Sequence, residues 1–289
     1  MTQARSERDD FSYEPFTRHG FYEAVNHALV EEVVGRLPGT PEHARTIVDL
    51  GCGTGAVTLQ VVQALQERGL DATIIGVEPS ADALTHAERR LAGSGLEVRF
   101  VQGDASDLAA LGTPVDAVFF CNAIHLVPDK RRAIADIAGV LVPGGVLAFN
   151  SSFFTGVYPP GTDNFYYRWT ANAMRWLRRE HPEVRLNRDE KTLARQWLSP
   201  EEYASLLREN GFDVLHCELE QVQMDLASFV DIGHYWLFIE GALPGAPLPA
   251  GADALAYGVR TTFEEQGLTS VPRNWLQVVA RLRDGADAV

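Results

Sequence analysis

Residues Ile47 to Gln60 read IVDLGCGTGAVTLQ, a short apolar run followed by glycines at alternate positions. The apolar run predicts a buried strand, and the residues from Ala56 onward predict a helix. Gly51, Gly53 and Gly55 therefore occupy the turn between a strand and a helix. Glycines at such a turn permit tight backbone conformations and a close approach of the main chain to a ligand. The stretch therefore indicates a nucleotide-like ligand at the end of this strand.

The same alternation of strand and helix continues beyond this turn. We expect strands at 46–50, 72–78, 96–104, 115–122 and 146–150, and helices at 21–36, 56–68, 81–91 and 129–141. A capping box formed by Ser199 and Glu202 predicts one more helix, which strands at 212–220 and 275–282 follow. Short turns between alternating strands and helices predict a parallel sheet covered on both faces. The predicted fold class is α/β, a Rossmann-like, seven-stranded, mostly parallel doubly wound sheet with an inserted, largely helical lid.

Two irregular stretches interrupt this alternation and define the expected domain organisation. The predicted parts are an N-terminal helical cap at 1–45, a ligand-binding α/β core at 46–150, an aromatic-rich lid insertion at 151–198, and a C-terminal part of the core sheet at 199–289 with a second lid insertion at 225–270. Residues 151–240 hold 15 of the 27 aromatic side chains. Aromatic walls are typical of small-molecule pockets, although the same rings also suit the core of a helical lid.

Composition narrows the partners and the compartment. The formal net charge of −14 repels phosphate backbones and anionic membranes, so we expect neither a nucleic acid nor a membrane as partner. Three widely spaced cysteines favour a reducing compartment over a disulfide scaffold or a structural zinc site. The polar N-terminal stretch MTQARSERDD lacks the apolar segment of a secretory signal. We expect a cytoplasmic protein, and the excess of arginine over lysine is associated with bacterial genomes.

Two classes of ligand are compatible with the glycine turn. The spacing of Gly51, Gly53 and Ala56 fits a dinucleotide fingerprint, and Glu78 lies where an acidic residue would hold the ribose. However, Asp49 would place a negative charge beside the pyrophosphate. S-adenosylmethionine carries no phosphate, and its sulfonium and α-ammonium groups are cationic, so the same aspartate favours it. The chemistry of the turn thus favours S-adenosylmethionine over a nicotinamide or flavin cofactor.

Four sequence blocks carry a resemblance to a known family. They are Asp49–Gly55, Gly76–Ser80, Gln102–Ala105 and Leu141–Gly145. In this order and spacing, the chain resembles the class I S-adenosylmethionine-dependent methyltransferases of the small-molecule type. The resemblance covers residues 45–150, and more weakly the elements at 200–220 and 272–282.

The resemblance implies a role for each residue that matches its motifs. It implies that Asp49 holds the amino group of the methionine moiety, that Glu78 accepts both ribose hydroxyls, and that Asp104 accepts from the adenine amino group near the Ala105 N–H. It places Asn122 where the methyl group emerges. The implied cofactor-binding set is Asp49, Gly51, Gly53, Gly55, Glu78, Pro79, Asp104, Ala105 and Asn122.

The residues that would act on the acceptor are less defined by sequence. His125 follows the fourth strand, where similar small-molecule methyltransferases can hold a general base, and the alternative is that it packs locally. His19 is the second catalytic candidate, in a segment that often covers the ligand in this family. The predicted substrate-binding residues are Tyr22, Phe153, Tyr166, Trp169 and His234. No set of His, Asp and Glu has the spacing of a metal site.

The sequence as a whole predicts methyl transfer from S-adenosylmethionine to oxygen, nitrogen or carbon of a small metabolite, in specialised metabolism. The expected assembly is a monomer or a homodimer. One alternative keeps the fold and the ligand without transfer, as a cyclase or a binding protein. The other alternative is a nicotinamide-dependent oxidoreductase.

Overall fold

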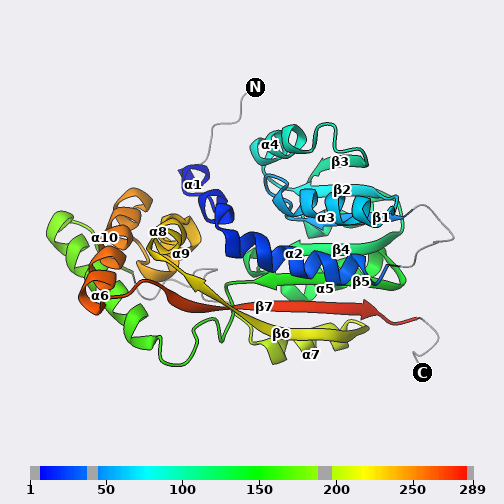
Figure 1. Cartoon of the computed structure of the whole chain (residues 1–289). Coiled ribbons are helices and arrows are strands. Elements are labelled where there is room, and N and C mark those ends of the chain that lie inside the picture. Colours follow the sequence, from blue (N-terminus) through cyan, green and yellow to red (C-terminus); the bar gives the residue numbers. More distant parts are fainter. Residues whose placement is uncertain (1–6, 38–44, 188–196, 285–289) are drawn as a thin grey trace. The chain divides into compact units, whose positions relative to one another are not determined.

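Seven strands form one sheet in the computed structural model, which describes residues 7–37, 45–187 and 197–284 (Figure 1). The strands are β1 (Thr46–Leu50), β2 (Thr73–Glu78), β3 (Glu97–Gln102), β4 (Val115–Cys121), β5 (Leu141–Ser151), β6 (Phe212–Met224) and β7 (Val271–Leu282). Their order across the sheet is β3-β2-β1-β4-β5-β7-β6. The first five strands pair in parallel, and β7 is antiparallel to β5. The predicted seven-stranded, mostly parallel fold class is confirmed.

The strand order creates one preferred ligand position. From β1 the chain continues to β2 and β3 on one side, and later to β4 and β5 on the other side. In open α/β sheets, ligands bind outside the carboxyl ends of the strands at the point where this order reverses. That point lies between β1 and β4, directly where the glycine turn leaves Leu50.

The chain divides into two compact units, which we call the sheet unit and the helical unit. The sheet unit comprises Ala24–Thr155, Leu198–Glu220 and Trp275–Val289, and the helical unit comprises Met1–Glu23, Gly156–Trp197 and Gln221–Asn274. Helix α2 (Gly20–Val34), β6 and β7 each have residues in both units. The division assigns most of α2 to the sheet unit, together with the predicted core.

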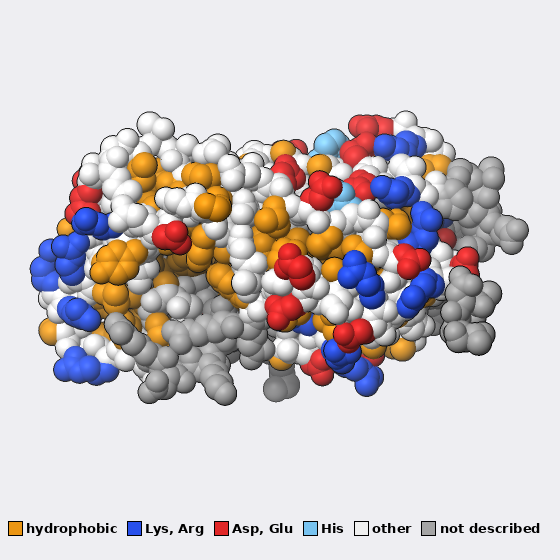
Figure 2. Space-filling model, turned by 90° about the horizontal axis from the view of Figure 1, so that it is seen from below, with side chains coloured by type: hydrophobic (Ala, Val, Ile, Leu, Met, Phe, Trp, Pro, Cys, Tyr) orange, Lys and Arg blue, Asp and Glu red, His pale blue; other side chains and the backbone are white. Residues whose placement is uncertain are grey.

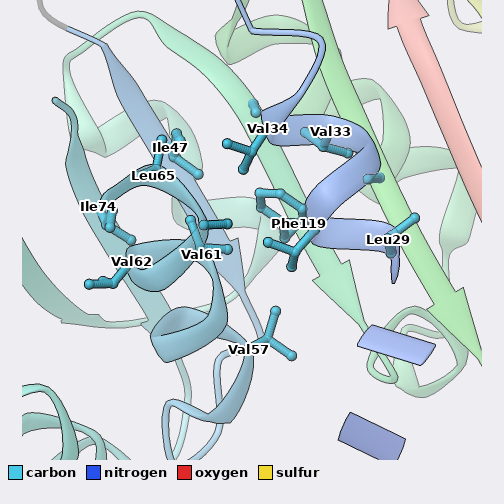
Figure 3. Packing of buried hydrophobic residues seen from close by; sticks show 14 of the residues in the cluster. Leu29, Val33, Val34, Ile47, Val57, Val61, Val62, Leu65, Ile74 and Phe119 are labelled. Atoms are coloured by element: carbon cyan, nitrogen blue, oxygen red, sulfur yellow. The ribbon is translucent and has the colours of Figure 1, made fainter. Parts of the chain in front are cut away.

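The helices of the sheet unit cover the strands. They are α3 (Ala56–Glu67), α4 (Ala81–Leu91), α5 (Lys130–Val140) and α7 (Pro200–Glu209), with short 3-10 helices η2 (Ala105–Leu111) and η3 (Ile124–Leu126). Figure 3 shows side chains of α2 and α3, among them Val33 and Val61, pointing toward Phe119 of β4. All three are fully buried. Burial of this apolar cluster, at about 25 cal/mol per Å² removed from water, holds both helices on the sheet.

The helical unit packs around aromatic side chains. Its helices are α1 (Glu7–Asp10), η1 (Glu14–Arg18), α6 (Asp163–Glu180), α8 (Leu226–His234), α9 (Trp236–Ala242) and α10 (Leu248–Gln266). The rings of Phe165 and Phe229 lie with centroids 4.8 Å apart and join α6 to α8. Gly258 lets α10 approach α6 closely, since a Cβ there would stand 2.7 Å from the Ala173 nitrogen. The lid is largely helical, as the fold-class prediction has it, although the individual helices at 225–270 were not predicted.

Exposed arginines mark one helix of this unit. Arg168, Arg175, Arg178 and Arg179 lie on α6 and are exposed. Figure 2 shows basic side chains gathered at its left edge, the side on which Figure 1 places α6. The Arg179 side chain pairs with Glu180 at 2.6 Å. The unit therefore exposes a cationic helix although the whole chain is acidic.

The largest difference from the sequence prediction lies at 225–270, which the structure forms into α8, α9 and α10 rather than an irregular stretch. Helix α8 begins at a cap that the prediction overlooked, where the Asp225 side chain accepts from the Ser228 N–H at 2.9 Å. Helix α10 ends at Gly267, which caps the helix in a left-handed conformation with a φ of 62°. Strand β5 begins at Leu141 rather than 146, and β7 begins at Val271 rather than 275.

Candidate active site

The glycine turn adopts backbone conformations that only glycine accepts readily. Gly51, Gly53 and Gly55 have φ angles of 69°, 53° and 80°. The Gly51 N–H donates to the Val77 carbonyl oxygen at 2.7 Å, which ties the turn to β2. A Cβ on Gly51 would stand 2.7 Å from the Ala123 Cβ, so the segment after β4 packs directly against the turn. The turn is thus held from two neighbouring strands.

Glu78 ends β2 with its carboxylate fixed by backbone N–H groups. Its Oε2 accepts from the Gly53 N–H at 3.1 Å, and its Oε1 accepts from the Ser80 N–H at 3.0 Å. Burial raises the pKa of this carboxyl above its ordinary value, and the two N–H groups oppose the rise. A carboxylate has about four acceptor positions, so each oxygen keeps capacity for one more donor. Pro79 follows it, exposed, and its carbonyl oxygen accepts from Gln102.

Asp49 lies in β1, two residues before the turn, and is 1% exposed. The Thr58 hydroxyl of α3 donates to its Oδ2 at 2.6 Å. Burial raises the pKa of Asp49 to about 7, the Thr58 hydrogen bond opposes the rise, and the nearby Glu78 carboxylate adds to it. Two carboxylates near one turn therefore favour a ligand that brings positive charge.

Asp104 has a structural role that the sequence reasoning did not include. Its Oδ1 accepts from both the N–H and the hydroxyl of Ser106, at 2.8 and 2.7 Å, and so caps η2. These bonds lower the pKa of Asp104 below its ordinary value. Asp107 completes the capping box by accepting from the Asp104 N–H. Asp104 is exposed and Ala105 is buried at the first position of η2.

Asn122 follows β4 in a left-handed conformation with a φ of 51°. It is 7% exposed, and its side chain lies 3.4 Å from Asn26 of α2. Its place beside Ala123 brings it next to the glycine turn. The structure therefore gathers the predicted cofactor residues of β1, β2 and β4 at one edge of the sheet unit.

His125 is enclosed in the sheet unit at 2% exposure. Its Nδ1 lies 3.1 Å from the Ser151 hydroxyl, and its ring stacks on Phe153 with centroids 4.5 Å apart. Phe153 is itself 1% exposed. These contacts match the alternative of local packing, and a base role for His125 stays a prediction.

His19, the other catalytic candidate, belongs to the helical unit. Its Nε2 lies 2.8 Å from the Asp231 carboxylate of α8, and its ring stacks on Phe21. A carboxylate partner orients the imidazole and leaves Nδ1 for a second contact. Tyr22, at the start of α2, is buried at 6% exposure and has Tyr13 at its edge.

The remaining substrate candidates also lie in the helical unit. Trp169 is 1% exposed, and its indole N–H donates to the Leu255 carbonyl oxygen at 2.8 Å, so it has a packing role. The Tyr166 hydroxyl accepts from the fully buried Arg273 guanidinium at 3.3 Å, and burial raises the pKa of Tyr166. His234 stacks on Phe11 with centroids 4.7 Å apart.

Two contributors to the site carried no recognised sequence signal. Thr58 holds Asp49, and Asn26 contacts Asn122. Thr58 lies in the first turn of α3 on its buried side, a position that periodicity could have indicated. Asn26 could not be found in this way, because its contact joins segments 96 residues apart.

A cavity of about 280 Å³ lies elsewhere in the sheet unit. Its lining comes from α2, β6 and β7 and includes Leu29, Glu32, His216 and Gln277. It does not include any residue of the glycine turn, so we assign it no part in the chemistry. Over the described ranges, we find no group of three or more His, Cys, Asp or Glu side chains placed to hold a metal ion. Within the same ranges, every helix is too short or too polar to cross a membrane.

Comparison with known proteins identifies the part of the chain that forms this site. Residues 47–145 match the family model described as a methyltransferase domain. A trans-aconitate 2-methyltransferase of Variovorax paradoxus is 34% identical over 127 residues, which are 44% of this chain and 45% of that protein. A demethylmenaquinone methyltransferase of Thermus thermophilus is 34% identical over 103 residues, covering 36% of this chain and 45% of that protein. The chain spans about half the length of the curated relatives it matches.

Solved structures share the fold over nearly the whole chain. A methyltransferase of Thiobacillus denitrificans in complex with S-adenosylhomocysteine covers 97% of this chain and 100% of its own, with a TM-score of 0.56 and 18% identity. The cyclase SpnF covers 93% of this chain and 85% of its own, with a TM-score of 0.54 and 20% identity.

The chain has the fold of the class I methyltransferases, and its residues 47–145 match a methyltransferase domain. Residues 47–145 are similar to methyltransferase domains, as the 34% identity to the trans-aconitate 2-methyltransferase also indicates.

Proposed function

We propose that the protein transfers a methyl group from S-adenosylmethionine to a small-molecule acceptor. The observation that carries the proposal is the carboxylate of Glu78, which the Gly53 and Ser80 N–H groups hold at the end of β2 beside the glycine turn. A fixed carboxylate at this position suits a pair of ribose hydroxyls. Each bond to a charged acceptor contributes about 1.5–3 kcal/mol.

The other residues of the sheet edge complete the cofactor site in this proposal. Asp49 would neutralise the α-ammonium group, because its buried carboxylate gains most from a positive partner. Asp104 would accept from the adenine amino group through Oδ2, since both of its described hydrogen bonds end on Oδ1. Gly51, Gly53 and Gly55 would give the ligand close access to the main chain, with Ala105, Pro79 and Asn122 around it.

The cofactor supplies an activated methyl group on a sulfonium. The protein therefore acts mainly by holding the nucleophile in line at about 3–3.5 Å from the methyl carbon. Where the nucleophile carries a proton, a histidine would receive it. His19 has a carboxylate partner in Asp231, whereas His125 is packed between Ser151 and Phe153. We propose His125 and His19 as the two candidates for this base.

The acceptor class follows from charge and from the relatives. A net charge of −14 disfavours a nucleic acid as the acceptor, so we propose a small metabolite instead. The proposed setting is specialised metabolism in the cytoplasm. The relatives named above act on trans-aconitate or demethylmenaquinone by their names, both small molecules. We propose that Tyr22, Phe153, Tyr166, Trp169 and His234 form the acceptor side, in a monomer or a homodimer.

Incubation with S-adenosylmethionine and a panel of small metabolites tests the proposal. The expected result is release of S-adenosylhomocysteine together with a product that is heavier by one CH₂ group. A ring-closed product without S-adenosylhomocysteine would favour the cyclase alternative, and binding of NADH in place of S-adenosylmethionine would favour the oxidoreductase. Either outcome would contradict the proposed transfer.

A further inference from the structure

Three buried asparagines meet in the sheet unit. Asn26 comes from α2, Asn122 follows β4, and Asn150 lies in β5, with exposures of 0%, 7% and 0%. Among the described residues, Asn122 is the one non-glycine residue with a positive φ, at 51°. Asparagine tolerates this left-handed conformation better than most residues, although it still needs support from its surroundings.

The hydrogen bonds determine which end of each carboxamide is the oxygen. The Asn122 main-chain N–H can only donate, and it points to the Asn150 Oδ1 at 3.1 Å as well as to the Asn150 carbonyl oxygen at 3.0 Å. The Asn150 Nδ2 is therefore the donor to the Asn26 Oδ1 at 2.8 Å. The same Asn26 oxygen must then accept from the Asn122 Nδ2 at 3.4 Å.

After these assignments, the Asn122 Oδ1 is the one carboxamide oxygen of the three to which no described donor points. It is buried and has no hydrogen-bond partner among the described residues. A buried carboxamide oxygen without a donor costs free energy, and such atoms in native structures call for an explanation. Asn122 also lies directly before Ala123, which packs on Gly51 of the glycine turn.

We infer that the Asn122 Oδ1 accepts an N–H from the α-ammonium group of the ligand, and that Asn26 and Asn150 are positioning residues for it. The inference rests on the proposed function. Asn26 and Asn150 fix both the left-handed main chain and the orientation of the carboxamide, so that an oxygen rather than an NH₂ group is presented. The NH₂ orientation would repel a cation, so the trio selects for a positively charged amino group at this edge.

Calorimetry with two ligands tests the inference. S-adenosylhomocysteine carries the ammonium group, whereas 5′-methylthioadenosine has the same nucleoside and thioether without it. Asn122→Ala and Asn26→Leu are expected to weaken S-adenosylhomocysteine by about tenfold or more and to leave 5′-methylthioadenosine unchanged. Asn26→Asp keeps an oxygen toward both Nδ2 groups and should retain the preference for S-adenosylhomocysteine.

The matched control is Gln277→Met. Gln277 also ties α2 to the sheet, through a bond from its Nε2 to the Val25 carbonyl oxygen at 2.7 Å, and its described hydrogen bonds go to Val25 and Glu220 rather than to Asn122. This variant should lose stability without losing the preference between the ligands. If Asn26→Leu does not fold, Asn122→Ala at the strand end carries the test. Equal weakening of both ligands, or unchanged affinity for both, would overturn the inference, whereas a wild-type protein that binds neither ligand would overturn the proposed function itself.

Discussion

At the scale of single residues, Asp49 is the group whose ionisation should change when the ligand binds. Burial raises the pKa of Asp49 to about 7. Between pH 4 and pH 7, a larger fraction of this carboxyl is therefore protonated in the ligand-free folded protein than in the unfolded chain. Its contribution to folding stability is therefore fully present below the unfolded pKa and is lost as the pH rises through about 7. A cationic ligand favours the ionised form, so its binding releases a proton near neutral pH.

This linkage predicts a pH-dependent affinity. The dissociation constant for S-adenosylhomocysteine should increase by up to about tenfold per pH unit below 7, because Asp49 must first be deprotonated. Calorimetry between pH 6 and pH 8, in buffers of different ionisation enthalpy, measures both the affinity and the released proton. The control is Asp49→Asn, which should bind more weakly at pH 8 and show a flat profile. An unchanged slope in that variant would assign the titration to another group.

Asp104 combines a cap with the proposed adenine contact, and two substitutions separate these roles. Asp104→Ala removes both and should cost about 1 kcal/mol of stability in addition to adenosyl affinity. Asp104→Ser can still cap η2 and should recover the stability but not the affinity. Thermal unfolding and S-adenosylhomocysteine titration of both variants provide the comparison. Full affinity in Asp104→Ser would show that the carboxylate does not touch the ligand.

At the scale of elements, the capping box of α7 offers a test that does not involve the ligand. The Ser199 hydroxyl accepts from the Glu202 N–H at 3.2 Å, and Glu202 accepts from the Ser199 N–H at 2.6 Å. Ser199→Ala should lower the free energy of unfolding by about 1 kcal/mol, as measured by denaturant titration. Ser205→Ala, in the exposed middle of the same helix, is the matched control and should have little effect. Equal losses in both would mean that the cap is not a stability determinant.

Elements with local signals could be predicted from the sequence. Strand β1 and helix α4 have the predicted bounds, because glycines and the Ser80 cap mark their ends. The helices at 225–270 were missed, since their caps lie in a stretch where the aromatic and apolar residues follow no simple period. In the candidate site, Glu78 could be placed because a strand end positions it. The contact of Asn26 with Asn122 could not be predicted, because it depends on tertiary packing between distant segments and leaves no local pattern in the sequence.

At the scale of the whole molecule, the chain joins a methyltransferase core to a helical unit built from three separated segments. The core segment 47–145 matches the family model, whereas the helical unit contains residues 156–197 and 221–274 outside it. The core segment is the part that resembles known methyltransferases, and we propose that the helical unit determines acceptor specificity. His19 and its partner Asp231 both belong to that unit.

Hydrogen exchange over the whole chain can map the ligand onto these units. S-adenosylhomocysteine should slow amide exchange at 49–55, 76–80 and 102–105, because it would rigidify the glycine turn and the neighbouring strand ends. Segments of the helical unit such as α10 serve as the internal reference. Protection confined to the helical unit would place the ligand away from the glycine turn.

Titration of S-adenosylhomocysteine into wild-type protein, Glu78→Ala and Glu97→Ala tests the central claim most directly. Glu97 is an exposed glutamate at the opposite end of the neighbouring strand β3, and it pairs with Arg99. The account predicts binding to wild type and to Glu97→Ala with equal affinity, and a loss of about tenfold or more in Glu78→Ala. Undiminished affinity in Glu78→Ala, or a wild-type protein that binds NADH and not S-adenosylhomocysteine, would contradict it.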